Sequence, residues 1–165
     1  MQTVAGGRRG TQPPGGSTVR PVVQGSGPIV VGVDGSAPSL NALEWAAEEA
    51  SVKKVDLHVV VGWHLPLMLG MPLPLPTDFD PIEPARDVLE GAKKAIAGNY
   101  PDLVVKTHIA EGSAARSLVR TAADVGASLL VVGARGHGEV SGLLIGSVSE
   151  KVATHAKCPV VVVRH

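Results

Sequence analysis

Residues 29–36 read Ile-Val-Val-Gly-Val-Asp-Gly-Ser, an almost continuous apolar run followed by three turn-forming residues. This pattern predicts a strand that is buried on both faces and stops near Asp34. Residues 40–50 then carry apolar side chains at helical spacing, which predicts a helix of about four turns with Ser36 or Ser39 as its N-cap. A buried strand that leads directly into a helix is the first half of a βαβ unit.

The alternation of strand and helix continues along the sequence. Apolar runs predict further strands at residues 55–61, 103–109, 129–132 and 160–163, and helical spacing predicts helices at residues 85–96, 115–125 and 147–156. Polar residues inside 103–109 favour an edge strand, and Gly126 has the place of a helix C-cap. Five strands alternating with four helices predict an α/β fold, a single open parallel sheet of the Rossmann-like type with helices on both faces.

The composition agrees with such a sheet and excludes several classes of protein. Only 2% of the 165 residues are aromatic, so the core is expected to consist mainly of Val, Ala and Leu. Fifteen Lys and Arg balance fifteen Asp and Glu, which argues against binding to nucleic acid or to an acidic membrane surface. No apolar run reaches the roughly 18 residues of a membrane helix, and the single Cys158 excludes an intramolecular disulfide. We therefore expect a cytoplasmic protein.

Two segments lack the pattern of strands and helices. Residues 1–27 are rich in Gly, Pro, Ser, Thr and Gln, so we expect a disordered N-terminal tail before one domain at residues 28–165. Residues 64–84 contain six prolines among leucines and methionines, and no regular element is expected there. A lid, a partner surface and a mobile loop are all compatible with that composition.

The loop after the fourth predicted strand carries the strongest functional signal. Residues 133–147 read Gly-Ala-Arg-Gly-His-Gly-Glu-Val-Ser-Gly-Leu-Leu-Ile-Gly-Ser and contain five glycines. Glycines allow the backbone to approach a ligand closely and to turn successive N–H groups toward an anion. Ser147 opens the next helix, whose free N–H groups and positive dipole end favour phosphate. In a doubly wound sheet this loop and the loop after the first strand border the ligand site.

Two known phosphate-binding loops do not fit this segment. A Walker loop needs Gly-Lys followed by Ser or Thr, whereas Gly146 is followed directly by Ser147 and the nearest lysine is Lys151. Ser141 stands where the dinucleotide fingerprint needs its third glycine, and that fingerprint belongs after the first strand.

The spacing Gly133-x2-Gly136-x9-Gly146-Ser147 resembles that of universal stress proteins of the ATP-binding type. The end of the first strand, Val33-Asp34-Gly35-Ser36, and the final run at residues 158–163 are similar to the same family. The resemblance covers nearly all of residues 28–165. It implies a five-stranded parallel sheet in the order 3-2-1-4-5 and bound ATP. We expect Mg²⁺ to accompany the ATP.

The resemblance also implies a set of binding residues. On the ribose and phosphate side these are Gly133, Arg135, Gly136, Gly146, Ser147, Val148 and Ser149. On the base side they are Gly32, Val33, Asp34 and Val61.

The residue types allow more than one role at several of these positions. The Asp34 carboxylate could accept a hydrogen bond from the base or ribose, help to hold a phosphate-bound cation, or only cap a turn. Arg135 could pair with phosphate or remain a solvated charge. His137 has no nucleophile at a recognisable spacing, and the six histidines show no metal-ligand spacing, so we predict neither catalytic residues nor a protein-held metal.

The favoured function is therefore a regulatory module that holds ATP and hydrolyses it slowly or not at all. A genuine ATPase or nucleotide hydrolase of the same fold is the enzyme alternative, and a receiver-like interaction domain is a third class. The strand at residues 160–163 is an edge in the implied order and is continuously apolar, which predicts a homodimer through that strand. The family resemblance implies the same dimer.

Overall fold

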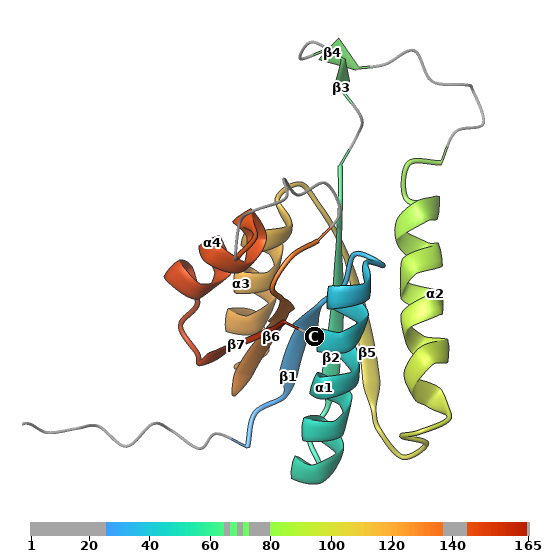
Figure 1. Cartoon of the computed structure of the whole chain (residues 1–165), viewed down its shortest axis with the longest axis vertical. Coiled ribbons are helices and arrows are strands. Elements are labelled where there is room, and N and C mark those ends of the chain that lie inside the picture. The colour runs from blue at the N-terminus through green and yellow to red at the C-terminus, as the bar shows by residue number, and fades with distance from the viewer. Residues whose placement is uncertain (1–25, 65–66, 69–70, 73–79, 137–144, 165) are drawn as a thin grey trace, which may run out of the picture.

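The computed structural model describes residues 26–64, 67–68, 71–72, 80–136 and 145–164 (Figure 1). Its main sheet contains five parallel strands, namely β1 (Ile29–Gly32), β2 (Leu57–Trp63), β5 (Val105–Glu111), β6 (Leu129–Gly133) and β7 (Val160–Val163). Their order across the sheet is β5-β2-β1-β6-β7, which confirms the predicted order 3-2-1-4-5. The edge position predicted for the third long strand, β5, is confirmed as well.

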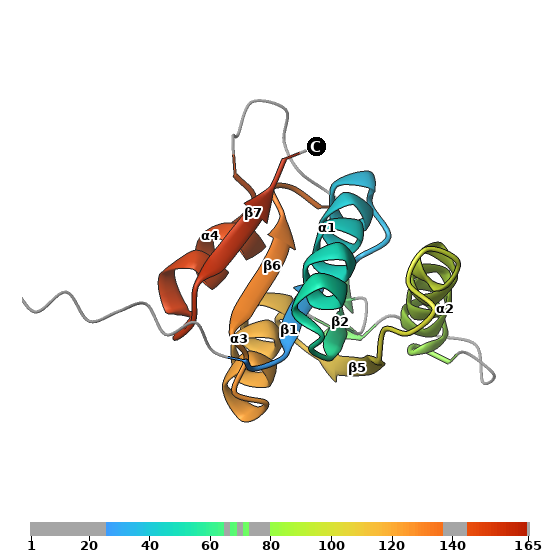
Figure 2. The same ribbon diagram turned by 90° about the horizontal axis from the view of Figure 1, so that it is seen from below.

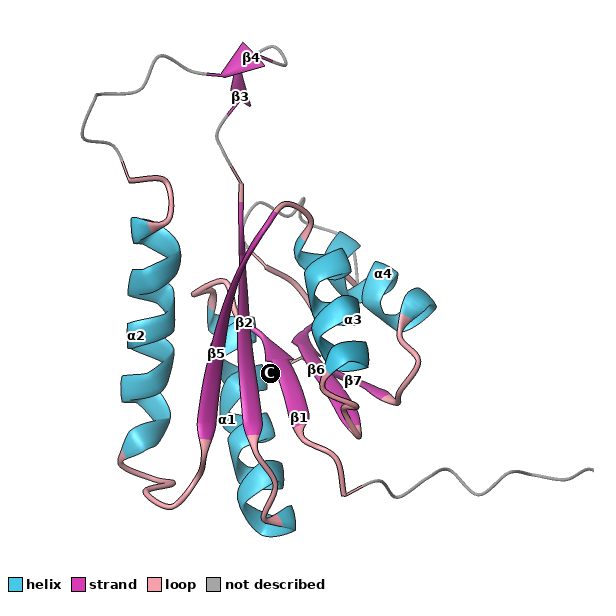
Figure 3. Cartoon of the chain, turned by 180° about the vertical axis from the view of Figure 1, so that it is seen from behind, coloured by secondary structure: helices cyan, strands magenta, loops and turns pink. Residues whose placement is uncertain are grey.

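Four helices cover the two faces of this sheet. Figures 2 and 3 show α1 (Ala37–Lys53) and α2 (Glu83–Ala97) on one side, and α3 (Ala114–Asp124) and α4 (Ser147–His155) on the other. Each pair of helices closes its own apolar cluster, so the central strands are buried from both sides. The buried side chains are almost all Val, Ala, Leu and Ile, as the low aromatic content requires.

Helix α1 begins where the first predicted turn ends. Ser36 is its N-cap, and its hydroxyl accepts a hydrogen bond from the N–H of Ser39 at 3.4 Å. At the other end Lys54 takes a left-handed conformation with φ of 54°, and Val55 donates its N–H to the carbonyl of Ala50 at 3.0 Å. Val55 therefore closes the helix, and for this reason β2 begins two residues later than predicted.

The prediction of no regular element in residues 64–84 is wrong at two places. Two-residue strands β3 (Leu67–Met68) and β4 (Met71–Pro72) pair in antiparallel fashion, and α2 begins at Glu83. Both strands of a two-stranded ladder are edges, where proline is tolerated because its missing N–H need not donate. The remaining prolines before Asp80 lie outside the described residues.

The ends of the predicted elements follow backbone pairing more than side-chain polarity. Strand β2 continues past its apolar run because Gly62 and Trp63 still pair with Ala110 and Glu111 of β5. Helix α3 ends as predicted, with Gly126 at a positive φ of 62°. None of the helices within the described ranges is long and apolar enough to cross a membrane. The predicted tail lies almost wholly outside these ranges.

A pair of histidines connects β2 and β5 on the side of α3. The ring nitrogen Nδ1 of His58 lies 2.9 Å from Nε2 of His108, and the rings stack with centroids 5.0 Å apart. Burial lowers the pKa of both side chains, and the neighbouring Lys106 lowers both pKa values further. For His58 the ring of His108 also lowers the pKa, whereas Asp56 acts in the opposite direction.

We expect the free energy of unfolding to fall as the pH is lowered from about 7.5 to about 5.5. The two folded-state pKa values lie below the ordinary value of 6.5, so the unfolded chain binds more protons in this range. The stabilisation is therefore complete above pH 6.5 and is lost as the pH falls through the folded-state pKa values. Urea denaturation of wild type and of His108→Gln at both pH values measures this change in the free energy of unfolding. The variant should lose less stability on acidification, and His155→Gln at an exposed site should behave as wild type.

Candidate functional site

A cavity of about 200 Å³ opens at the carboxyl ends of the central strands. Its walls come from the end of β1, the end of β6 and the beginning of α4, which meet where the chain crosses from one face of the sheet to the other. Figure 1 shows this edge of the sheet below the short β3–β4 ladder. The position is the one at which doubly wound sheets bind their ligands.

The cavity brings together most of the predicted binding residues. Its walls include Gly32, Val33, Asp34, Gly133, Arg135, Gly136, Ser147, Val148 and Ser149. Six further residues line the cavity without a sequence motif that indicates them, namely Ser39, Val60, Gly62, Ala114, Leu118 and Val132. Of these, Ala114 and Leu118 come from α3, and no local sequence motif indicates that α3 lies next to the site.

Val61 and Gly146 are placed differently from the other predicted residues. The side chain of Val61 is 3% exposed and packs in the cluster under α1 and α2, whereas its neighbours Val60 and Gly62 line the cavity. This follows from the two-residue repeat of a strand, which turns adjacent side chains to opposite faces. Gly146 is the N-cap of α4, and its N–H donates to the carbonyl of Ala134 at 2.7 Å.

The Asp34 carboxylate joins the two halves of the cavity. Its Oδ1 accepts hydrogen bonds from the N–H and the hydroxyl of Ser36, at 3.0 and 2.5 Å, so the residue does form the predicted turn. Its Oδ2 faces Gly136 so closely that a Cβ added at Gly136 would collide with it. The lack of a side chain at Gly136 therefore allows the loop after β6 to approach the loop after β1.

Gly133 and Ser149 anchor the other side of the cavity. The Ser149 side chain is 3% exposed, and its hydroxyl donates to the carbonyl of Gly133 at 2.6 Å. A Cβ at Gly133 would lie 2.7 Å from the backbone carbonyl carbon and oxygen of Pro38. β6, α1 and α4 thus meet at these two residues, and the Ser149 proton is held by the protein itself.

We expect Ser149→Ala to lower the free energy of unfolding by about 1–2 kcal/mol, because the buried Gly133 carbonyl loses a hydroxyl donor. Ser147→Ala is the matched control from the same helix. Its side chain is exposed, so its effect on stability should stay within about 0.5 kcal/mol. Urea denaturation of both variants compares the two serines, and an equal loss of stability would contradict the anchoring role.

The beginning of α4 gives the cavity a wall that attracts anions. Gly146 contributes no side-chain cap, and Ser147, Val148 and Ser149 form the first turn of the helix against the cavity. The first-turn N–H groups have no partners within the helix and lie at the positive end of its dipole. Across the opening, Arg135 is exposed at the end of β6. The arrangement fits a ligand with a negatively charged end.

Other predicted candidates do not contribute to the described site. His137 and the glycines at 138 and 142 lie outside the described residues. Within those residues, no group of three or more His, Cys, Asp and Glu side chains is placed to hold a metal ion. The spacing of the histidines in the sequence does not indicate the contact between His58 and His108, because the register of β2 against β5 creates it.

The family profile of the universal stress proteins matches residues 26–164. A universal stress protein of Mycobacterium tuberculosis strain H37Rv is 35% identical over 140 residues, which cover 83% of this chain and 45% of the relative. A relative from Mycolicibacterium smegmatis is 37% identical over 145 residues with coverage of 83% and 45%. The chain therefore spans about half the length of these curated relatives.

Solved structures of the same family are similar to this fold. One is a universal stress protein in complex with cAMP, which is 28% identical, has a TM-score of 0.63 and covers 84% of this chain and 96% of its own. Another, from Archaeoglobus fulgidus in complex with dAMP, is 26% identical with a TM-score of 0.62 and covers 83% and 97%. Together with the sheet order and the split glycine loop, these matches show that the chain belongs to the universal stress protein family.

Proposed function

We propose that this chain binds ATP in the cavity between β1, β6 and α4, and that it acts as a regulatory module with slow or no hydrolysis. The observation that carries the proposal is the convergence of the α4 N-terminus, the loop after β6 and Asp34 on one cavity at the switch point. The cAMP and dAMP complexes of relatives support an adenine nucleotide as the ligand class. We propose a cytoplasmic location, because ATP is a cytoplasmic nucleotide and the single half-buried thiol of Cys158 suits a reducing compartment.

We propose that the phosphates occupy the side of the cavity formed by Gly133, Gly136 and Ser147, where Arg135 can reach them. The base and ribose then lie toward Gly32, Val33 and Asp34. Val60 and Gly62 extend that side of the cavity, which makes them better candidates for base contacts than the side chain of Val61.

Mg²⁺ would be held mainly by the phosphates of the nucleotide. Magnesium takes oxygen ligands and commonly uses one or two carboxylates together with substrate phosphates. Asp34 is the carboxylate among the described residues that line the cavity, so the residues present fit an ion of this kind. The ion would supply charge neutralisation at the phosphates.

The described lining favours binding over turnover. Asp34 and Arg135 are the ionisable residues among the described residues of the cavity. Lys151, the lysine nearest to the glycine loop in sequence, lines a groove on the outer side of α4 instead. Positioned lysines and water-orienting groups are the parts that speed phosphoryl transfer.

Equilibrium dialysis with ATP, AMP and cAMP tests the proposal on the full chain. We expect ATP to bind one site per chain and to release phosphate far more slowly than about 1 per second, the lower end of enzyme rates. Folded protein that takes up none of the three nucleotides would overturn nucleotide binding. Turnover at enzyme rates would support the ATPase alternative.

We also propose that the chain forms a homodimer through β7. In the described sheet β7 pairs only with β6. The N–H of Leu130 donates to the carbonyl of Pro159, and the N–H of Ala134 donates to the carbonyl of Val163. Every second residue of β7, counted from Pro159, therefore turns its backbone groups toward β6. The N–H and C=O groups of Val160 and Val162 therefore point away from β6, toward a second copy.

A proline at the outer edge tests this dimer without removing a bond between β6 and β7. We expect light scattering to find two chains per particle for wild type and one for Val162→Pro. Thr107→Pro is the matched control, because it removes an outward N–H from β5 at the opposite edge. A monomeric wild type, or a Val162→Pro variant that still dimerises, would contradict the proposal.

A further inference from the structure

A groove of about 670 Å³ separates α3 and α4 on the outer side of the molecule. Arg116 and Arg120 of α3 form one wall, and Lys151 and His155 of α4 form the other. Val119 contributes an apolar patch between them. The groove is distinct from the nucleotide cavity, because the two share no lining residue.

The spacing of the basic residues is regular. Arg116 and Arg120 lie four residues apart, as do Lys151 and His155, and residues at this separation are neighbours on one face of a helix. Each wall of the groove therefore carries two basic groups, about 5–6 Å apart at their Cβ atoms. The ring of His155 is oriented by its contact with the Lys151 carbonyl, where Nδ1 lies 2.8 Å from the oxygen.

The three permanent cations of the groove have no ion-pair partner in the described part of the chain. The ion pairs found there use Lys53, Arg86, Lys93 and Lys106, all outside α3 and α4. Asp124 follows Arg120 by one turn and Glu150 precedes Lys151, yet neither makes an ion pair with them. Because the whole chain carries equal numbers of acidic and basic residues, this is a local concentration of positive charge.

We propose that the groove between α3 and α4 docks an acidic peptide segment of a partner protein. Carboxylates at helical or strand spacing match the basic side chains on the two walls, and the guanidinium groups of Arg116 and Arg120 suit bidentate contacts with carboxylates. The volume exceeds what a single small anion needs, and the apolar patch at Val119 favours a ligand that also carries aliphatic side chains.

A nucleic acid fits the same groove less well. The cations occupy a short patch, and the balanced net charge gives no long-range attraction for a polyanion. The docking surface does not depend on the proposed nucleotide site, although α3 and α4 contribute different residues to both. The two proposals can therefore fail separately.

Fluorescence anisotropy on the full chain tests the proposal. The probe is a labelled peptide of glutamate and leucine in which glutamates repeat at every fourth position. The comparison peptide carries glutamine in place of each glutamate. We expect the wild type to bind the glutamate peptide at least about 5-fold more tightly than the glutamine peptide, and added salt to reduce the difference. Equal binding of the two peptides, or no binding, would overturn the proposal.

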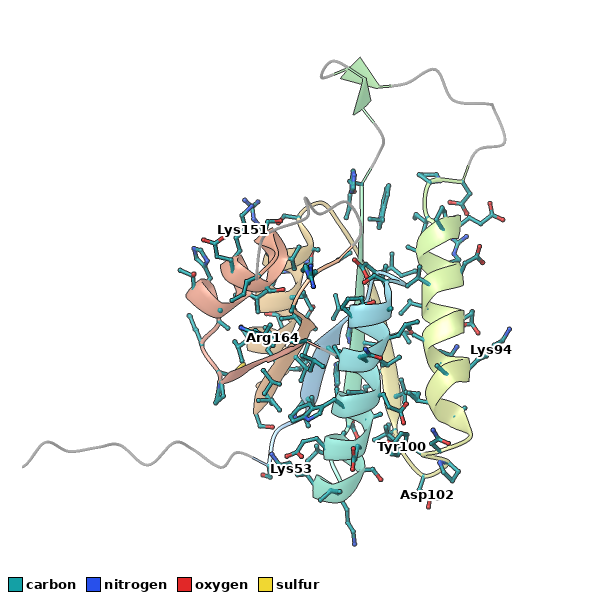
Figure 4. The ribbon with its side chains drawn as sticks, viewed as in Figure 1. Lys53, Lys94, Tyr100, Asp102, Lys151 and Arg164 are labelled. Carbon is teal, nitrogen blue, oxygen red and sulfur yellow. The ribbon has the colours of Figure 1, made fainter. Side chains whose placement is uncertain are left out.

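Charge reversals locate the binding surface. We expect Arg120→Glu and Lys151→Glu each to weaken glutamate-peptide binding by about 5-fold or more. Lys94→Glu is the matched control, since Lys94 is an exposed cation on α2, on the opposite side from Lys151 (Figure 4). ATP uptake by Arg120→Glu should match that of wild type. An equal loss in Lys94→Glu, or tighter binding of a short DNA duplex than of the peptide, would contradict docking of an acidic peptide.

Discussion

Replacing Gly136 with valine should weaken ATP binding by at least about 100-fold, or about 2.8 kcal/mol. The reason is the close approach of the two loops that form the cavity. Even a Cβ at this position would collide with Asp34 Oδ2, and that carboxylate is already held by the Ser36 hydroxyl and N–H. A branched side chain would therefore separate Asp34 from the loop after β6 and occupy the mouth of the cavity.

The fold itself should survive this substitution. Gly136 is half-buried at the rim, and the atom that the new side chain meets belongs to an exposed side chain and not to the backbone of a helix or strand. Gly91→Val is the matched control, because Gly91 is exposed on α2 and a Cβ there meets no atom within 4 Å. Dialysis against ATP and thermal unfolding of both variants separate binding from stability. If Gly136→Val binds ATP as tightly as wild type does, Gly136 does not belong to the ATP site.

Replacing Gly133 with valine should destabilise the protein by about 3 kcal/mol, at the upper end of what overpacking costs. A Cβ at Gly133 would lie 2.7 Å from the Pro38 carbonyl and 3.0 Å from the Ser39 nitrogen. These atoms belong to the backbone of the first turn of α1, so α1 and β6 must move apart as whole elements. The same residue accepts the Ser149 hydroxyl, and α4 would be displaced with it.

Thermal and urea unfolding measure this effect. For a chain of this size a loss of about 3 kcal/mol lowers Tm by about 6–12 °C. Gly91→Val again serves as control and should change stability by no more than about 0.5 kcal/mol, because valine is no worse than glycine within a helix. A Gly133→Val variant as stable as the control would show that the junction of α1, β6 and α4 tolerates separation.

The parallel sheet with helices on both faces was predictable because each strand is a short apolar run and each helix has a regular apolar face, whereas the order of its strands was implied only by the family resemblance. The central strand β1 is the clearest case, since its buried residues form one uninterrupted run. The ends of strands were less predictable. Gly62 and Trp63 belong to β2 because they pair with β5, and the local sequence does not indicate this pairing.

The candidate site was predictable where its residues come from one loop or one helix start. The glycine spacing located Gly133, Gly136 and Ser147, and the first turn located Asp34. Contacts that depend on tertiary packing were missed. Ala114 reaches the cavity because α3 packs over β2, and a Cβ at Gly62 would touch it at 3.0 Å. Ser149 lines the cavity as the resemblance implies, and its hydroxyl donates to the Gly133 carbonyl, a contact that the sequence does not indicate.

Amide NMR spectra of labelled protein titrated with ATP test the central claim most directly, because they report both binding and its location. The cavity between β1, β6 and α4 predicts that the largest shift changes fall at residues 32–34, 133–136 and 147–149. Gly91 on α2 and the groove residues Arg116 and Arg120 should change little. Largest changes in the groove or on α2, or a spectrum unchanged by saturating ATP, would contradict the account.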